Sequence, residues 1–169
     1  MASLIGNYSL IFGLCVAFLI IFFSVKNFRQ KNIFDNKIIS LTFLQLFFVL
    51  LSFSGLIISF VNSDFSNETV FNHSHTTKPL FYKISGTWGN HEGSLLLWLL
   101  VLTLFIFVFL LRTKEQNNQY RILTLIFQQI IIIGFFIFII KTSNPFNYIF
   151  PIPNEGLGLN PILQDPALA

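Results

Sequence analysis

Charge is scarce in this sequence. Only 10% of its 169 residues are charged while 54% are hydrophobic, and the mean hydropathy is +0.72. A water-soluble domain of this length needs more polar surface. The net charge of +3 is small. The basic residues mark which loops stay inside rather than a nucleic-acid-binding surface, so no nucleic-acid partner is expected. The chain therefore belongs in a lipid bilayer.

Cysteine and targeting signals are also lacking. Cys15 is the single cysteine, which excludes an intrachain disulfide and a thiol pair. The first apolar run has no basic segment before it and no small-residue cleavage site after it, so we expect a retained helix. No Arg-rich presequence for organellar import is present. These absences predict a protein that is bacterial or made inside its own organelle.

Long apolar runs are what the sequence does have. A helix needs roughly 20 residues to cross a hydrocarbon core of about 30 Å. Four runs are of about this length, at residues 6–25, 38–61, 94–111 and 122–140. They predict an all-α integral membrane protein with a four-helix membrane domain over residues 1–141. Gln128 and Gln129 interrupt the fourth run, and at least one should face a neighbouring helix that satisfies its amide.

Basic residues cluster in two loops. Seven of the ten lie within residues 26–37 and 112–121. Loops rich in Lys and Arg stay on the cytoplasmic or matrix side. Both termini and the loop at residues 62–93 are therefore predicted to face outward.

The tail, residues 142–169, contains five of the six prolines. Proline removes a backbone donor and stops helix continuation, so a fifth span is excluded. The tail is nevertheless too apolar for a solvated disordered segment. We predict a non-helical segment that lies across the outer face of the protein.

The segment GTWGNHEGS, residues 86–94, directly precedes the third run. Asn90 is a plausible N-cap, which places His91 and Glu92 in the first helical turn, where the helix dipole favours a carboxylate and a neutral imidazole. Leu95 occupies the position of the second histidine in an HExxH motif, which excludes a zinc-protease site. An alternative is that the tryptophans and His91 only lie at the membrane–water interface, where such side chains are common, and form no functional site.

Two histidines of the second loop, His73 and His75, form an H-x-H pair. No third ligand lies near them in the sequence, so no metal site is predicted.

Residues 86–98, GTWGNHEGSLLLW, resemble the W-G-x-H-E-G-S-x-L-L-W segment of the CcmF/NrfE family, the cytochrome c haem lyase subunits of the system I maturation pathway. SNPF at residues 143–146 and PNEGLGLNPILQDPALA at residues 153–169 are similar to the outer-face segment that follows the fourth helix of this family. The resemblance covers the whole chain but only the N-terminal portion of the family.

The resemblance implies an assembly that receives haem b as its substrate from a haem-delivery chaperone. The assembly directs thioether attachment of this haem to the C-x-x-C-H motif of an apocytochrome c. In the family the LQDP segment continues into a histidine, two prolines and a Trp-rich loop, whereas this sequence ends at Ala169. We therefore expect the N-terminal subunit of a split lyase, with the haem held mainly by a second chain.

The resemblance also implies two groups of site residues and no catalytic residue. The expected support for the haem and apocytochrome site is Trp88, Gly89, His91, Glu92, Gly93 and Trp98. The expected docking segment for the other half of the lyase comprises Asn160, Pro161, Gln164, Asp165 and Pro166. His91 is expected to be a supporting contact rather than an axial ligand.

The expected location is the mitochondrial inner membrane, with a bacterial inner membrane as the alternative. The alternative function is that of a structural subunit of a respiratory-chain membrane complex, which would share the spans and the 23 phenylalanines. Such a subunit would carry ionisable residues for proton transfer within its spans. The four apolar runs contain no Lys, Arg, Asp, Glu or His.

Overall fold

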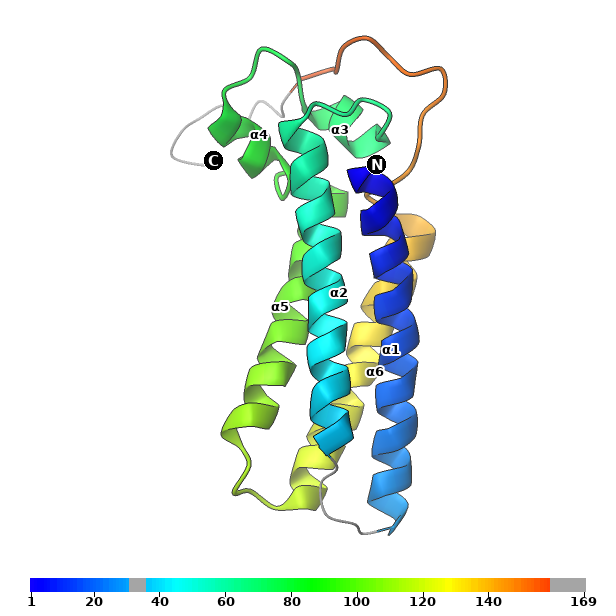
Figure 1. Cartoon of the computed structure of the whole chain (residues 1–169), viewed down its shortest axis with the longest axis vertical. Coiled ribbons are helices and arrows are strands. Elements are labelled where there is room, and N and C mark those ends of the chain that lie inside the picture. Colours follow the sequence, from blue (N-terminus) through cyan, green and yellow to red (C-terminus); the bar gives the residue numbers. More distant parts are fainter. Residues whose placement is uncertain (31–35, 159–169) are drawn as a thin grey trace.

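The computed structural model describes residues 1–30 and 36–158, and these residues are helical over most of their length. In chain order the helices are α1 (Ala2–Gln30), α2 (Asn36–Val61), α3 (Glu68–His73), α4 (Leu80–Gly86), α5 (His91–Arg112) and α6 (Asn118–Thr142) (Figure 1). Of these, α1, α2, α5 and α6 are long and apolar enough to cross a membrane. No β-strand occurs in the described ranges. The predicted all-helical fold with four spans is confirmed.

Each spanning helix extends past the apolar run that predicted it. The 29 residues of α1 give a length of about 43 Å, against about 30 Å of hydrocarbon. A hydropathy pattern stops at the first charged residue, whereas helical hydrogen bonding continues through it. Arg121, expected in a loop, lies instead near the start of α6 and donates to the Leu110 carbonyl at 2.8 Å, satisfying an end carbonyl of α5.

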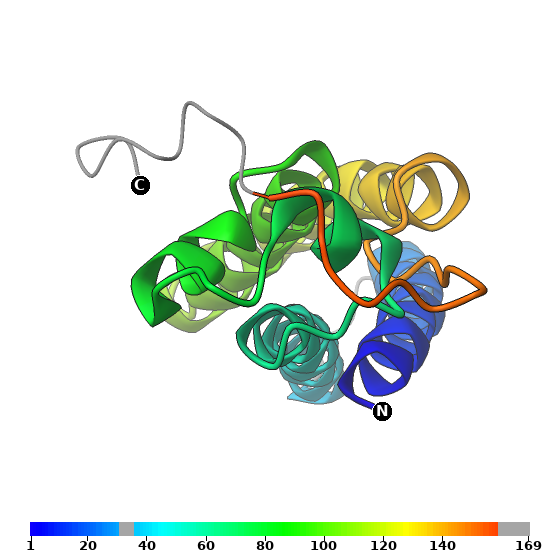
Figure 2. The same ribbon diagram turned by 90° about the horizontal axis from the view of Figure 1, so that it is seen from above.

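The spanning helices form a closed ring around an apolar interior. Helix α1 packs against α2 and α6, and α5 completes the ring by packing against the same two helices (Figure 2). Glycines permit the close crossing of α1 and α2, because a Cβ at Gly55 would lie 2.9 Å from the Ala2 carbonyl oxygen. Such close packing holds membrane helices together where lipid removes the hydrophobic driving force.

One polar contact connects the diagonal helices α2 and α6. Gln45 and Gln129 are both fully buried and exchange two amide hydrogen bonds, of 3.2 and 2.8 Å. Each amide therefore satisfies the other where water is excluded. The expectation that one glutamine of the fourth run faces protein is confirmed by Gln129, while Gln128 is half-buried.

One end of the bundle carries additional structure, here called the cap and comprising residues 62–90 and 143–158. The loop at residues 62–93 contains α3 and α4, and the N-terminus of the chain lies at this end (Figure 1). The opposite end carries six of the nine described basic residues, namely Lys26, Arg29, Lys37, Arg112, Lys114 and Arg121. This charge separation predicts that the cap faces outward.

The described part of the tail, residues 143–158, is non-helical and crosses the cap beside α3. Its backbone is held at both ends of this crossing. The bonds are Glu68 N to Asn147 O at 2.9 Å, Ile149 N to Ser66 O at 3.0 Å, Leu157 N to Phe71 O at 2.8 Å and Gly158 N to Ser74 O at 3.1 Å. A Cβ at Gly156 would lie 2.1 Å from the Ser74 carbonyl oxygen, so only glycine allows this close approach. Residues 143–158 thus follow the surface of the cap without forming a helix, and the outward orientation of the tail stays a prediction.

The amide pair in the bundle interior gives a first prediction. Gln129→Leu should lower the free energy of unfolding by about 1–3 kcal/mol, because it leaves the Gln45 amide buried without a partner. The double variant Gln45→Leu/Gln129→Leu should recover most of this loss. Reversible unfolding in detergent micelles measures the free energy of unfolding of Gln129→Leu, of Gln45→Leu and of the double variant. A double variant whose loss equals the sum of the two single losses would contradict the pairing.

The tail gives a second prediction, through Glu155. Thr76 donates to its carboxylate from Oγ1 at 2.7 Å and from the backbone N at 3.0 Å. These bonds, the hydroxyl bond first, lower the pKa of Glu155 below its ordinary value of 4.5. The stabilisation is therefore present above about pH 4.5 and is lost as the pH falls through the folded-state pKa.

Hydrogen exchange at the Leu157 and Gly158 amides should report this loss as lower protection factors at acid pH, relative to the intrinsic exchange rate at the same pH. Glu155→Gln keeps an acceptor but cannot titrate, so it should remove the pH dependence. An unchanged acid response in Glu155→Gln would assign the loss to another group.

Candidate functional site

The first turn of α5 is fixed by a side-chain cap. The Asn90 side-chain oxygen accepts from the Gly93 backbone N at 2.7 Å, and its amide nitrogen donates to the Gly86 carbonyl at 2.7 Å. The predicted N-cap is confirmed, and His91 and Glu92 begin the helix. Gly93 is required here because an added Cβ would lie 1.7 Å from the Thr87 carbonyl oxygen. The conformation of GTWGNHEGS thus follows from one asparagine and one close backbone contact.

His91 connects the start of α5 to the end of α6. Its Nε2 lies 3.1 Å from Oγ of Ser143, the C-cap residue of α6. The direction of this hydrogen bond depends on which ring nitrogen carries the proton, but the contact is possible with either tautomer. The two motif-bearing segments, which two spans separate in sequence, therefore meet in space.

A polar pocket of about 220 Å³ lies beside this contact. Helix α3, the first turn of α5, the end of α6 and the start of the tail all contribute to its wall. The lining residues are Glu68, Thr69, Asn72, Glu92, Thr142, Ser143, Asn144 and Asn147. Two carboxylates with amides and hydroxyls make a wall that favours a cationic or hydrogen-bonding group over an apolar one.

Asn67 holds the α3 side of this pocket in place. Its side-chain oxygen accepts from Val70 N at 3.2 Å, which caps α3. Its amide nitrogen donates to the Pro145 carbonyl at 2.9 Å and to Ser3 Oγ at 3.0 Å. One nearly fully buried amide thus joins α1, α3 and the tail.

Electrostatics near the pocket involve His73 and Glu92. Burial lowers the pKa of His73 below its ordinary value of 6.5, and the Glu92 carboxylate partly opposes this shift. The His73 ring is therefore neutral at pH 7. Neutral His73 therefore adds no positive charge beside Glu92.

The predicted aromatic residues lie outside the pocket. Trp88 is 37% exposed and Trp98 is 60% exposed. Trp98 is seven residues after His91 and so lies about 10 Å along the same helix. Of the predicted group, Glu92 lines the pocket and His91 contacts its wall through Ser143. Gly89 and Gly93 shape the turn, with Gly89 N bonded to the Ser85 carbonyl.

Sequence reasoning missed most of the pocket wall. Ser143 and Asn144 belong to the SNPF segment and could have been found from it. For Glu68 and Asn72 the only sequence signal is Asn67, a residue type that often precedes a helix. The predicted docking segment, Asn160, Pro161, Gln164, Asp165 and Pro166, lies outside the described residues. Its position relative to the pocket stays a prediction.

Within residues 1–30 and 36–158, no group of three or more His, Cys, Asp or Glu side chains could hold a metal ion. His75 instead contacts Thr77 Oγ1 at 2.9 Å through Nδ1.

Known proteins resemble this chain in sequence. Residues 88–169 match the family model described as cytochrome C assembly protein. The cytochrome c-type biogenesis protein CcmF of Haemophilus influenzae is 36% identical over 173 residues, which cover 99% of this chain and 26% of that protein. The biogenesis protein CycK of Rhizobium meliloti is 46% identical over 121 residues, covering 72% of this chain and 18% of its own length.

The fold has a counterpart among solved structures. The structure titled cytochrome c heme lyase CcmF matches 87% of this chain with a TM-score of 0.73 and 26% identity, and this match covers 25% of its own chain. The chain thus spans about a quarter or less of the length of these proteins. The agreement of family model, relatives and structure shows that this chain belongs to the CcmF/NrfE family of cytochrome c biogenesis proteins and corresponds to the N-terminal portion of a CcmF-like protein.

Proposed function

We propose that this chain forms the N-terminal part of a cytochrome c haem lyase, and that its cap helps to position haem and apocytochrome c for thioether attachment. The observation that carries the proposal is the meeting of two family-like segments at one pocket. His91 and Glu92 begin α5, Ser143 and Asn144 follow α6, and the 3.1 Å contact between His91 and Ser143 joins them. Because the two segments meet at one pocket, their residues can act on the same substrate.

The chemistry asks for positioning rather than for a protein nucleophile. Thioether formation adds a thiol S–H across a haem vinyl group, so haem and apocytochrome supply all reacting atoms. Holding two reactants in register can supply several kcal/mol of the barrier, of the order of 7 in favourable cases. A cap fixed by Asn67 and Asn90 offers the rigidity that such positioning needs.

The two substrates would contact different parts of the cap and of helix α5. A 220 Å³ polar pocket is smaller than typical ligand cavities of about 300–1,000 Å³ and does not suit a flat apolar plate such as haem. Glu68 and Glu92 suit a basic side chain of the apocytochrome. The exposed faces of Trp88 and Trp98 suit the haem plane. His91 acts in this arrangement as a support, because its Nε2 contacts Ser143.

The proposed partners are the remainder of the lyase, a haem-delivery chaperone and apocytochrome c. The proposed location is an inner membrane with the cap outside. The relatives named above are bacterial, which fits a bacterial inner membrane and gives no support to the mitochondrial prediction.

A structural role within a larger membrane complex is the second candidate. It is favoured by the large aromatic side chains on the outside of the bundle, such as Phe105 at 66% and Phe127 at 67% exposure. These surfaces could contact other membrane subunits as readily as lipid.

The lyase proposal predicts matched defects at the two ends of the connecting contact. His91→Ala and Ser143→Ala should each lower c-type cytochrome by about fivefold in cells that depend on this chain, the effect of one hydrogen bond. The double variant should be no worse than either single variant, because both remove the same contact. Haem-stained gels, normalised to the membrane level of the chain, measure the effect.

His75→Ala is the matched control, since it changes a cap histidine that does not line the pocket. A severe defect in His91→Ala with none in Ser143→Ala would show that His91 acts directly on haem. Unchanged cytochrome levels in all variants, in an assembly that also binds no haem, would favour the structural alternative.

A further inference from the structure

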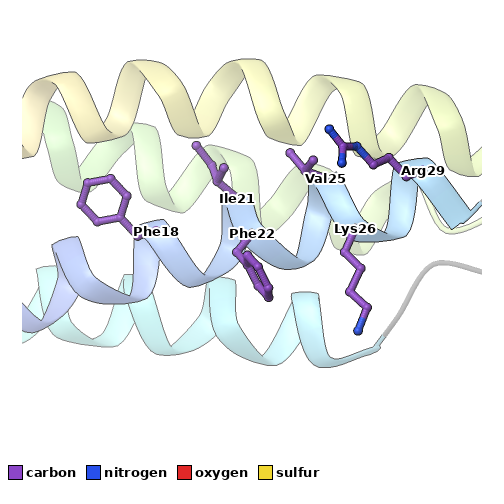
Figure 3. A pocket seen from close by; sticks show the side chains of 6 residues that line it. All are labelled: Phe18, Ile21, Phe22, Val25, Lys26 and Arg29. Carbon is purple, nitrogen blue, oxygen red and sulfur yellow. The ribbon is translucent and has the colours of Figure 1, made fainter.

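A groove runs along the outside of α1 towards its basic end. It has a volume of about 530 Å³ and is lined by residues of this helix (Figure 3). The lining side chains are Phe18, Ile21, Phe22, Val25, Lys26 and Arg29. Ile21, Val25 and Arg29 form one row at four-residue spacing, and Phe22 and Lys26 form the other. Figure 3 shows Arg29 directed towards α6 and Lys26 directed towards α2, on opposite sides of the groove.

The groove changes from apolar to basic along its length. Phe18 to Val25 supply an apolar floor, and Lys26 and Arg29 follow at the end of the bundle opposite the cap. No hydrogen bond or ion pair of Lys26 or Arg29 is found among the described residues, and none of the described lining residues is acidic. The eleven-residue separation of Phe18 and Arg29 corresponds to about 16 Å, about the depth of one leaflet of a 30 Å hydrocarbon core.

The residue types argue against another transmembrane helix as the occupant. Closely packed membrane helices place small residues at their interface. In α1 those residues face inward, since a Cβ at Gly13 would lie 2.9 Å from the Phe136 ring and Ala17 is fully buried. The outward face carries bulky side chains, with Phe18 52% and Phe22 62% exposed. Bulky side chains separated by a groove suit a flexible acyl chain better than a helix backbone.

We propose that this groove binds an anionic phospholipid, with an acyl chain between the two rows and the phosphate between Lys26 and Arg29. Basic residues at the cytoplasmic end of membrane helices attract anionic headgroups. An acyl chain of one leaflet would cover the floor from Phe18 to Val25. The site is independent of the cap and of the proposed lyase function.

Native mass spectrometry of the full chain, released from nanodiscs, tests the proposal. The nanodiscs contain equal amounts of phosphatidylglycerol and phosphatidylcholine. Wild type should retain phosphatidylglycerol preferentially, and Lys26→Gln/Arg29→Gln should lower that retention by about fivefold for each charge removed. The matched control Arg112→Gln/Lys114→Gln removes two exposed charges at the same end of the bundle but outside the groove.

Equal loss in the control, or no preference in wild type, would overturn the proposal. Val25→Trp keeps both charges and fills the groove, and it should also lower retention; an unchanged value would overturn the acyl-chain part. Circular dichroism of each variant confirms that the bundle is intact.

Photocrosslinking in native membranes tests the occupant. Benzoylphenylalanine at Phe22 should label phospholipid more strongly than the same probe at Phe105, an exposed position on α5 outside the groove. Labelling of a polypeptide at Phe22 would show that protein covers this face, and would overturn the proposal.

Discussion

The cap depends on one buried amide, that of Asn67. Its side-chain oxygen caps α3. Its amide nitrogen donates to Ser3 in the first turn of α1 and to the Pro145 carbonyl at the start of the tail. A buried amide left without these partners would cost about 1–3 kcal/mol, so the three segments are tied to one arrangement. Because α3 and the tail form much of the pocket wall, the site exists only while this junction is intact.

The two halves of the molecule are held by different forces. The bundle relies on close packing at glycines and on one amide pair, as expected where lipid solvates apolar surface as well as protein does. The cap relies on asparagine caps and short backbone contacts, such as that of Gly93 with the Thr87 carbonyl. Positions fixed by hydrogen bonds have defined geometry, and the family-like residues lie in this half.

Local patterns predicted the parts of the structure that depend on local chemistry. Apolar runs located the four spans because a bilayer requires them, and Asn90 was identified as a cap because its partners lie within four residues. The helix ends were missed, since hydropathy does not report hydrogen bonding past a charged residue. Helices α3 and α4 were missed because short helices take their stability from packing rather than from their own sequence.

The sequence alone determined a four-span membrane protein and membership of a family whose motifs it carries. It also predicts the sidedness of the helices and a non-helical tail, of which residues 143–158 are described. Only the tertiary structure decided that His91 lies against Ser143, that Glu68 joins Glu92 in one pocket, and that α1 leaves a groove ending in Lys26 and Arg29. The reason is physical. Span length and caps follow from neighbours along the chain, whereas a pocket wall depends on how distant helices pack.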